Sequence, residues 1–386
     1  MSESALLRML HEAIGSSPIP EKRHIIHFKT RSAFARFMTA FEEAGELFPI
    51  KSVIRPMKII HAICCTMKSG FPPLQHPSIR LIEEDIPIRV HAARIRHPQQ
   101  PVLLRQAGNA IPWGIKQIKA PEVWKETRGG RIRIGVVDTG IDYSHPDLRG
   151  RISRGINLLN RALLPTDDNG HGTHISGTIA ASNRESGLLG VAPHAMIHPV
   201  KAFDNNGTAY VSDIVMGIDW CVHNRMHIIN MSFGMKNRSK SLHDAVRNAN
   251  KLGIVIVASS GNEGKQSSID YPARFSQVIS VGATAANRKI ASFSNKGRSI
   301  DIYAPGDKIK STWLQHKYME LSGTSMATSH ISGVIALMLT IRPDLAPGDI
   351  KSLLQKTSNP VSGLKSRSGV RAGEVDAVRA LKHLGT

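Results

Sequence analysis

Short apolar runs alternate with longer stretches of helical length over the middle of the chain. The runs IRIGVVD, MIHPVKAF, HIINMSF, GIVIVAS and VISVGA begin at residues 132, 196, 227, 253 and 278. Stretches long enough for helices lie between them, at residues 172–181, 212–224 and 241–252. Buried-type strands that alternate with helices predict a parallel sheet covered by helices on both faces. In such a sheet the functional residues gather at the carboxyl ends of the strands.

The first 91 residues follow a different pattern, in which strands dominate. A helix is predicted over residues 32–44, because Phe34, Phe37 and Phe41 recur at helical spacing. A second, short helix is expected after Ser69. Extended runs predict strands at residues 24–28, 50–54, 58–66, 78–82 and 87–90. This mixture predicts a small α+β sandwich.

Residues 92–110 show no hydrophobic period. They mix prolines, paired glutamines and arginines, which is typical of an exposed linker at a domain boundary. The chain therefore divides into an N-terminal extension (residues 1–21), a small domain (22–91), the linker (92–110) and a large α/β domain (111–386).

Composition excludes several classes of protein. The chain has 386 residues, of which 41% are hydrophobic and 21% charged, as in ordinary globular proteins. The sequence contains no run of about 18 apolar residues, so no transmembrane segment is predicted. The first residues lack the basic start and apolar stretch of a secretory signal, and three cysteines are too few for a disulfide framework. We expect a reducing compartment, the cytoplasm, with release by another route left open.

The net charge is unusual. Fifty Lys and Arg against 30 Asp and Glu give +20, which raises nucleic acids and other polyanions as partners. The excess is spread along the chain without a block of like charges, and only 5% of residues are aromatic. A nucleic-acid groove usually interleaves basic and aromatic residues. We therefore expect a solvated basic surface and no specific nucleic-acid partner.

Three polar residues stand where predicted elements begin or end. Asp138 closes the run IRIGVVD, His171 opens a helix in DDNGHGTH, and Ser325 opens another in SGTSMATSH. A serine hydroxyl becomes a nucleophile when a base takes its proton, and the base needs a carboxylate to fix its tautomer. Each residue alone has a structural explanation, as a turn-capping aspartate, a loop histidine and an N-cap serine. Their conjunction predicts a nucleophilic hydrolase.

The residues that flank these three carry a family resemblance. VVDTGID, NGHGTH and GTSMAT match, in order, the signature blocks of the subtilase family, so the chain resembles a subtilisin-type serine endopeptidase. The resemblance implies that Ser325 attacks the scissile carbonyl to form an acyl-enzyme, that His171 acts as base and then acid, and that Asp138 orients His171. Asn262, in ASSGNEG, matches the donor to the developing oxyanion. No cofactor is implied for catalysis.

The same resemblance implies a subtilisin-like three-layer sandwich with a mostly parallel central sheet. HIIHFK and PSIRLIEEDIPIRV resemble the inhibitor-like propeptide of the family, a small α+β domain of ferredoxin-like type. IPWGIKQIKAPEVW resembles the start of a mature enzyme. We therefore expect a self-processing proenzyme that is cut near His91 or at Arg105. Its implied partners are protein and peptide substrates and its own propeptide, which acts as an intramolecular inhibitor.

Substrate contacts are also implied by the resemblance. The segments NMSFG and GTAY match those that pair with the substrate backbone. Their contact residues are Ser232, Phe233, Gly234, Gly207 and Thr208. The pocket for the side chain before the cut bond (P1) is implied to have walls of Ser259, Ser260 and Gly261. Asp270 near its base favours basic P1 side chains, with Glu263 assisting and Lys265 opposing.

Family members often bind a structural calcium ion. The matching ligands are the carboxylate of Asp147 and the carbonyls of Ser182, Ser186 and Leu188. Arg184 stands where the family places an oxygen ligand, and a cation beside calcium is unfavourable. An altered or empty site and one in which Glu185 compensates are both left open.

Two other classes of protein remain as alternatives. A pseudoprotease with a binding role is disfavoured, because all four catalytic positions hold the expected residue types. A nucleic-acid-binding protein rests on the net charge alone.

Overall fold

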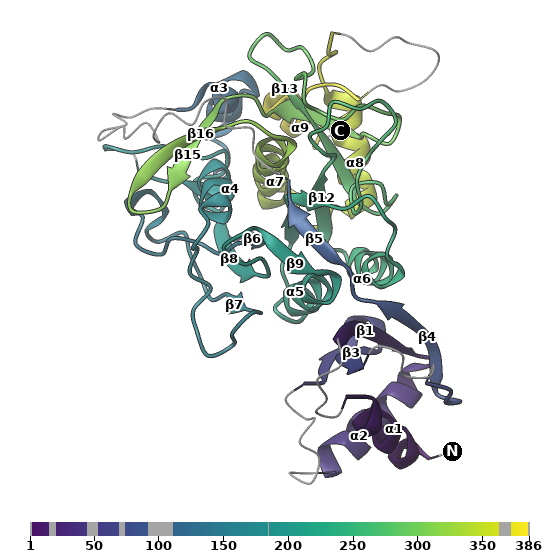
Figure 1. Cartoon of the computed structure of the whole chain (residues 1–386). Coiled ribbons are helices and arrows are strands. Elements are labelled where there is room, and N and C mark those ends of the chain that lie inside the picture. The colour runs from purple at the N-terminus through teal and green to yellow at the C-terminus, as the bar shows by residue number, and fades with distance from the viewer. Residues whose placement is uncertain are drawn as a thin grey trace.

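Two domains follow one another along the chain. Figure 1 shows a computed structural model, which describes residues 2–14, 21–44, 53–68, 74–91, 111–183, 185–362 and 372–384. The N-terminal domain packs against one side of the larger domain, and strand β5 extends from it into the larger domain.

A seven-stranded parallel sheet forms the centre of the larger domain, in the order β14-β13-β12-β10-β6-β8-β7. Its strands are β6 (Arg133–Asp138), β7 (Ile156–Asn157), β8 (Met196–Lys201), β10 (Ile228–Met231), β12 (Val255–Ser259), β13 (Ile279–Thr284) and β14 (Ile302–Pro305). The five predicted apolar runs supply β6, β8, β10, β12 and β13.

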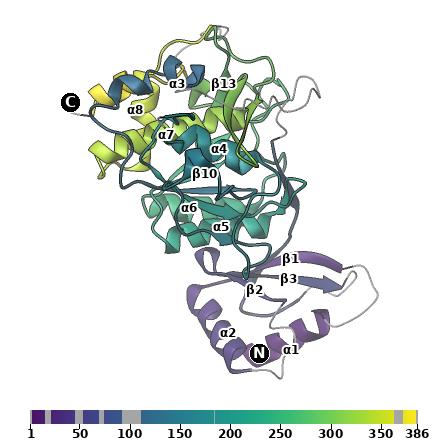
Figure 2. The ribbon, with the colours of Figure 1, turned by 90° about the vertical axis from the view of Figure 1, so that its left-hand side faces the viewer.

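Helices cover both faces of this sheet. Helices α4 (His171–Ala180) and α7 (Thr324–Ile341) lie on one face, and α5 (Val211–His223) and α6 (Lys240–Lys251) lie on the other, as Figure 2 shows. Two apolar cores result, one on each face. The predicted α/β three-layer fold is therefore confirmed.

Smaller elements complete the larger domain. They are the helices α3 (Trp113–Gln117), α8 (Pro347–Thr357) and α9 (Ala377–Lys382), the 3-10 turns η4 (Ala120–Val123) and η5 (Pro146–Leu148), and the hairpin of β15 (Ile309–Trp313) and β16 (Lys317–Leu321).

Helix α7 is the one described helix that is long and apolar enough to cross a membrane by length and composition. However, 89% of its apolar window is buried inside the protein. It packs on β10, β12 and β13 as the central helix of one core.

The N-terminal domain has an antiparallel sheet in the order β2-β3-β1-β4. Its elements are α1 (Glu3–Ile14), β1 (Glu21–Phe28), α2 (Arg31–Glu43), β2 (Arg55–Met57), η3 (Lys58–Ile60), β3 (Ala62–Lys68) and β4 (Ile79–Glu84). The sequence analysis predicted no element in the segment that forms α1, although this helix buries Leu6, Leu7 and Leu10 in the core of the domain.

Two predicted strands of this domain begin later than expected. The strand predicted from Lys58 starts at Ala62, because a 3-10 turn precedes it and His61 adopts a left-handed conformation (φ 50°). The strand predicted at residues 50–54 is misplaced: Val53 and Ile54 are not in a strand, and β2 begins at Arg55. Residues 50–52 lie outside the described residues. The helix expected after Ser69 also begins outside them.

The N-terminal sheet buries both of its faces. Successive side chains of a strand point to opposite faces. In β1, Ile26 faces the core with α1 and α2, whereas Ile25 joins the core that contains α5 and α6. In β3, Cys65 faces the core with α1 and α2, and Cys64 faces the core that contains α5 and α6. The outer face of this sheet therefore docks on the larger domain.

Strand β5 (Pro87–Val90) does not join the N-terminal sheet, which the sequence analysis expected it to complete. It pairs antiparallel with β9 (Thr208–Tyr210) and β11 (Phe233–Gly234) of the larger domain. The preceding turn is fixed there because Asp85 accepts hydrogen bonds from the backbone N–H and the hydroxyl of Ser212.

Candidate active site

Asp138 and His171 meet at the carboxyl edge of the central sheet. Asp138 is the last residue of β6 and His171 is the first residue of α4. Their side chains lie 2.7 Å apart, from Asp138 Oδ1 to His171 Nδ1, and both residues are buried. The carboxylate therefore fixes the imidazole so that Nε2 is the nitrogen left for chemistry.

The turns that carry both residues are held by a second carboxylate. Asp167 Oδ1 accepts hydrogen bonds from the hydroxyl of Thr139 and the backbone N–H of Gly170, and its Oδ2 accepts from Thr173. Lys201, at the end of β8, donates to the carbonyl of Thr139 at 2.6 Å. Neither Asp167 nor Lys201 was predicted from the sequence, although Asp167 stands within the DDNGHGTH block.

The electrostatic surroundings of His171 oppose one another. Burial favours the neutral imidazole, whereas the charge and hydrogen bond of Asp138 favour the protonated form. Asp138 prevails, and the pKa of His171 is raised above its ordinary value. In contrast, burial lowers the pKa of His174 to about 3, and its Nε2 donates to backbone carbonyls of the β15–β16 hairpin, so His174 is a neutral structural residue.

Ser325 lies in the first turn of α7, which packs against α4. Its hydroxyl donates to the carbonyl of Ser232 at 3.0 Å. His171 Nε2 is buried and has no hydrogen-bond partner among the described residues. His171 Nε2 can therefore form a hydrogen bond only with a side chain that rotates toward it or with a molecule that enters the site.

Two donors converge beside Ser325. Asn262 Oδ1 accepts hydrogen bonds from the backbone N–H and the hydroxyl of Thr324, which sets the direction of its Nδ2 amide. The point where a side chain on Gly323 would begin lies 3.1 Å from Asn262 Nδ2 and 3.8 Å from the backbone nitrogen of Ser325. Both nitrogen atoms therefore border the same space beside Gly323.

The two segments matched to substrate binding lie on either side of β5. Arg89 pairs with Thr208 of β9 on one side and with Gly234 of β11 on the other. The backbone N–H of Val90 donates to the carbonyl of Gly207 at 3.0 Å. The chain thus places its own strand between the two segments that were matched to substrate binding.

The residue that follows β5 is His91, and its side chain is only 6% exposed. His91 Nδ1 lies 2.7 Å from Ser259 Oγ, and Nε2 lies 3.0 Å from Asp270 Oδ2. Lys236 pairs with Asp270 Oδ1 at 2.5 Å and with Glu263 at 2.7 Å. The cation beside Asp270 is therefore Lys236, which the sequence analysis missed, because the two residues come together only in the fold.

The remaining residues matched to the pocket lie around this cluster. Ser260 and Gly261 are buried, and Gly261 has a left-handed conformation (φ 106°) that places it against Asp270. Burial opposes ionisation of Asp270, but His91 and Lys236 outweigh it and lower the pKa of this carboxyl.

Comparison with known proteins agrees with this geometry. The model of the subtilase family matches residues 129–373. The chain belongs to the subtilase family. It is 36% identical to the thermostable alkaline protease of Halalkalibacterium halodurans over 359 residues, covering 93% of this chain and 92% of that protein. It is also 36% identical to subtilisin E of Bacillus subtilis over 364 residues, which are 92% of this chain and 89% of that one.

A further relative, subtilisin DY of Bacillus licheniformis, is 40% identical over 252 residues, covering 64% of this subtilase and 91% of that protein. Membership and these relatives make this chain a serine endopeptidase, a hydrolase that requires no cofactor for catalysis.

The residues matched to calcium do not fit the ion in their present arrangement. Calcium needs six to eight oxygen ligands. Both oxygens of Asp147 instead accept N–H groups, Oδ1 from Asn183 at 2.9 Å and Oδ2 from the backbone of Leu188 at 2.7 Å. The described residues contain no group of three or more His, Cys, Asp or Glu that could hold a metal, and Arg184 lies outside them. Ser182 and Ser186 belong to the same loop, which closes directly on Asp147.

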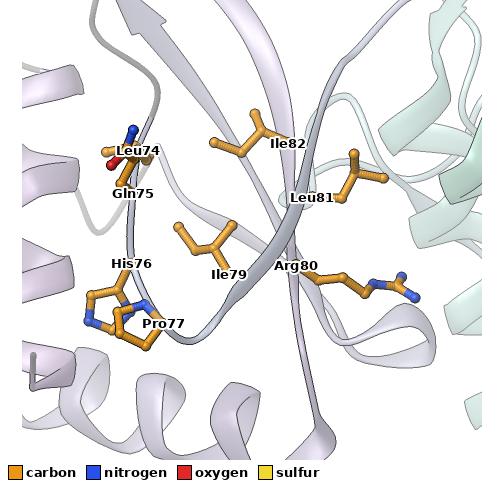
Figure 3. A pocket seen from close by; sticks show the side chains of 8 residues that line it. All are labelled: Leu74, Gln75, His76, Pro77, Ile79, Arg80, Leu81 and Ile82. Carbon is orange, nitrogen blue, oxygen red and sulfur yellow. The ribbon is translucent and has the colours of Figure 1, made fainter.

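A separate hollow lies on the N-terminal domain of the subtilase (Figure 3). Residues 74–77 and strand β4 line it, with Ile79 and Ile82 on the side of Leu74. Arg80 extends to the other side, where it pairs with Asp244 of the larger domain. The hollow shares no lining residue with the space between β9 and β11 that β5 occupies, hereafter the cleft.

Proposed function

We propose that this subtilase hydrolyses peptide bonds with Ser325, His171 and Asp138 acting together. The Ser325 hydroxyl turns from the Ser232 carbonyl to His171 Nε2 and attacks the substrate carbonyl as His171 takes its proton. His171 then returns the proton to the leaving amine, and water repeats the sequence on the acyl-enzyme. The 2.7 Å contact of Asp138 with His171 and the unpartnered Nε2 support these roles.

Negative charge on the carbonyl oxygen needs donors that are already in place. Asn262 Nδ2 and the Ser325 N–H are the candidates, because both border the same space near Gly323. The two hydrogen bonds from Thr324 hold the Asn262 amide before substrate arrives.

The protein is also proposed to be a proenzyme that cuts its own chain after His91. The observation that carries this proposal is the path of β5, which runs antiparallel between β9 and β11 and delivers His91 into the P1 pocket. The N-terminal domain then acts as an intramolecular inhibitor, since its strand occupies the substrate position. Arg105, the alternative processing site, lies outside the described residues.

Comparison of the wild type with Ser325→Ala tests both proposals. The wild type should react with a fluorophosphonate probe and shorten to a chain that begins at Ala92, whereas Ser325→Ala should stay full-length and unlabelled. A new terminus at Gln106 would contradict the assignment of His91. Processing of Ser325→Ala, or a wild type that is neither labelled nor processed, would contradict the catalytic assignment.

A reducing compartment, the cytoplasm, is proposed as the place of action. Cys64, Cys65 and Cys221 are all buried, free thiols, as is common where disulfides do not form. Fractionation of the source cells with an antibody to the larger domain tests this proposal.

A further inference from the structure

The P1 pocket holds a histidine through both of its ring nitrogens. Ser259 contacts Nδ1 of His91 at 2.7 Å, and Asp270 contacts Nε2 at 3.0 Å. The Asp270 side chain is only 3% exposed, so its carboxylate is almost completely shielded from solvent in this arrangement. Both ring nitrogens of His91 therefore have a hydrogen-bond partner in the pocket.

The two partners suit imidazole chemistry in both of its protonation states. The Asp270 carboxylate only accepts, so it takes the proton of Nε2. The Ser259 hydroxyl can donate to a bare Nδ1 or accept from a protonated one. An aromatic or aliphatic P1 side chain would fill the space but leave the buried carboxylate without this partner, which is costly.

Lys236 limits what else the carboxylate can bind. Its ammonium group already pairs with Asp270 Oδ1 and with Glu263. A lysine or arginine at P1 would bring a second cation to the same carboxylate, next to Lys236, and like charges placed together are unfavourable.

Two glycines of the pocket lie against Asp270. The position of a side-chain carbon on Gly234 would lie 2.8 Å from Asp270 Cβ, and that on Gly261 would lie 2.8 Å from Asp270 Oδ2. The same position on Gly234 would lie 2.3 Å from His91 Nε2. The imidazole and Asp270 therefore both pack directly against Gly234.

We propose that the P1 pocket selects histidine, read by Ser259 and Asp270, and that Lys236 is the residue that excludes lysine and arginine. This inference rests on the proposed function and narrows its substrate class to peptides with histidine before the cut bond. It replaces the general preference for basic side chains that Asp270 alone implied.

The test uses peptides that keep the sequence of β5, Ile-Arg-Val-X followed by a fluorogenic leaving group, with X as His, Phe or Arg. Processed wild type should show a kcat/KM for His that exceeds those for Phe and Arg by about tenfold or more, the scale of the hydrogen bonds lost. The assays belong above the raised pKa of His171, where the base is neutral.

Two variants separate the charge of Lys236 from its bulk. Lys236→Met should raise the Arg-to-His ratio of kcat/KM by about tenfold, because Asp270 loses its resident cation. Lys236→Arg, the matched control, keeps the cation and should retain the wild-type ratio.

The wild-type peptide series decides the inference whether or not the variants fold. Faster cleavage of the Phe or Arg peptide than of the His peptide, in a wild type that reacts with the fluorophosphonate, overturns the inference and leaves the proposed function intact. An unchanged ratio in folded Lys236→Met overturns the role of Lys236. A wild type that neither reacts with the probe nor cleaves any peptide overturns the proposed function as well.

Discussion

His171 is a buried histidine whose pKa is raised chiefly by the carboxylate of Asp138, with Asp167 acting in the same direction. Burial would keep the imidazole neutral, and the contact with Asp138 reverses this tendency. A raised pKa means that His171 stays protonated to a higher pH than a free histidine. Since only the neutral imidazole can accept the proton of Ser325, the catalytic assignment makes activity depend on this balance.

We expect the acid limb of kcat/KM in the wild type to lie above the ordinary histidine value of 6.5. In Asp138→Asn the charge is lost while burial remains, so the limb should move to lower pH. The kcat should fall by about 10⁴-fold, because the amide no longer holds the correct tautomer. Profiles of kcat/KM against pH for both proteins measure these effects.

Asp168→Asn is the matched control for this prediction. Asp168 is half exposed and pairs with Lys201, and it is not among the groups that shift the pKa of His171. Its acid limb should coincide with that of the wild type. An equal limb in wild type and Asp138→Asn would contradict the role given to Asp138.

The catalytic candidates were accessible from sequence because each stands in a short contiguous block. Asp138, His171 and Ser325 each have flanking glycines and threonines, and Asn262 lies between Gly261 and Gly264. No short block of sequence indicates the pairing of Lys236 with Asp270, because the two residues are 34 positions apart. A contact of this kind becomes visible only when the backbone path is known.

At the scale of elements, the start of helix α6 shows how the two domains are joined. Glu83 at the end of β4 accepts hydrogen bonds from the backbone N–H groups of Lys240 and Ser241 and from the Ser241 hydroxyl. The N-terminus of a helix favours a negative charge. Burial opposes ionisation of Glu83, but hydrogen bonds, including that of His27, prevail and lower its pKa to about 2.

Glu83→Gln should therefore destabilise the full-length Ser325→Ala protein near neutral pH. A lowered pKa in the folded state contributes stability that is present above the ordinary glutamate value and lost as pH falls from about 4.5 toward about 2. The gap in Tm between variant and parent should shrink over this range. Thermal unfolding followed at several pH values measures it.

Glu84→Gln serves as the control. Glu84 is more than half exposed, and among the described residues its ion pair is with the exposed Lys22. Exposed pairs contribute little. A Glu84→Gln effect as large as that of Glu83→Gln would contradict the capping role.

The loop at residues 182–188 gives a prediction about metal removal. Asp147 is satisfied by the amide of Asn183 and the N–H of Leu188, so the loop needs no cation to balance this carboxylate. Excess EDTA should leave the Tm of the Ser325→Ala protein unchanged, and added calcium should not raise it. A Tm that rises with calcium concentration, as expected for a ligand that binds only the folded state, would contradict this prediction.

Among the elements of the larger domain, the strands β6, β8, β10, β12 and β13 and the helices α4, α5 and α6 were predicted to within a few residues, because each apolar run ends at turn residues. The strands β7 and β14, the β15–β16 hairpin and the helices α8 and α9 were not predicted. Strand β5 was predicted as a strand, but its pattern could not indicate which sheet it joins. Apolar residues at every second position indicate a strand with one buried face, but they do not indicate which strands pair with it. Helix α1 was missed because its segment was set aside as an extension.

For the whole molecule, several arginines of the N-terminal domain pair with aspartates of the larger domain. Arg23 and Arg55 of the N-terminal domain pair with Asp213 at 3.3 and 2.8 Å, and Arg80 pairs with Asp244 at 3.2 Å. The guanidinium of Arg23 also lies 3.9 Å from the ring centre of Tyr210. These contacts give basic residues of the N-terminal domain a role in docking the two domains.

The apolar core beside α5 and α6 contains residues from both domains. Ile25, Met57 and Ile88 lie in it, each at most 1% exposed. We therefore expect full-length Ser325→Ala to unfold in one cooperative transition in calorimetry. Ile25→Ala should lower its Tm by removing about 2–5 kcal/mol of stability. Two separate transitions in the parent protein would contradict a shared core.

The short connection between β4 and β5 has a kinetic consequence. Only Asp85 and Ile86 separate the two strands, so the segment that fills the cleft is tethered to a domain that is itself docked. Its occupancy is unimolecular, and diluting the protein does not release it. A competing peptide must displace a tethered strand whose effective concentration is in about the millimolar range. Access to the cleft is therefore governed by cutting or undocking this tether and depends little on how much substrate surrounds the intact chain.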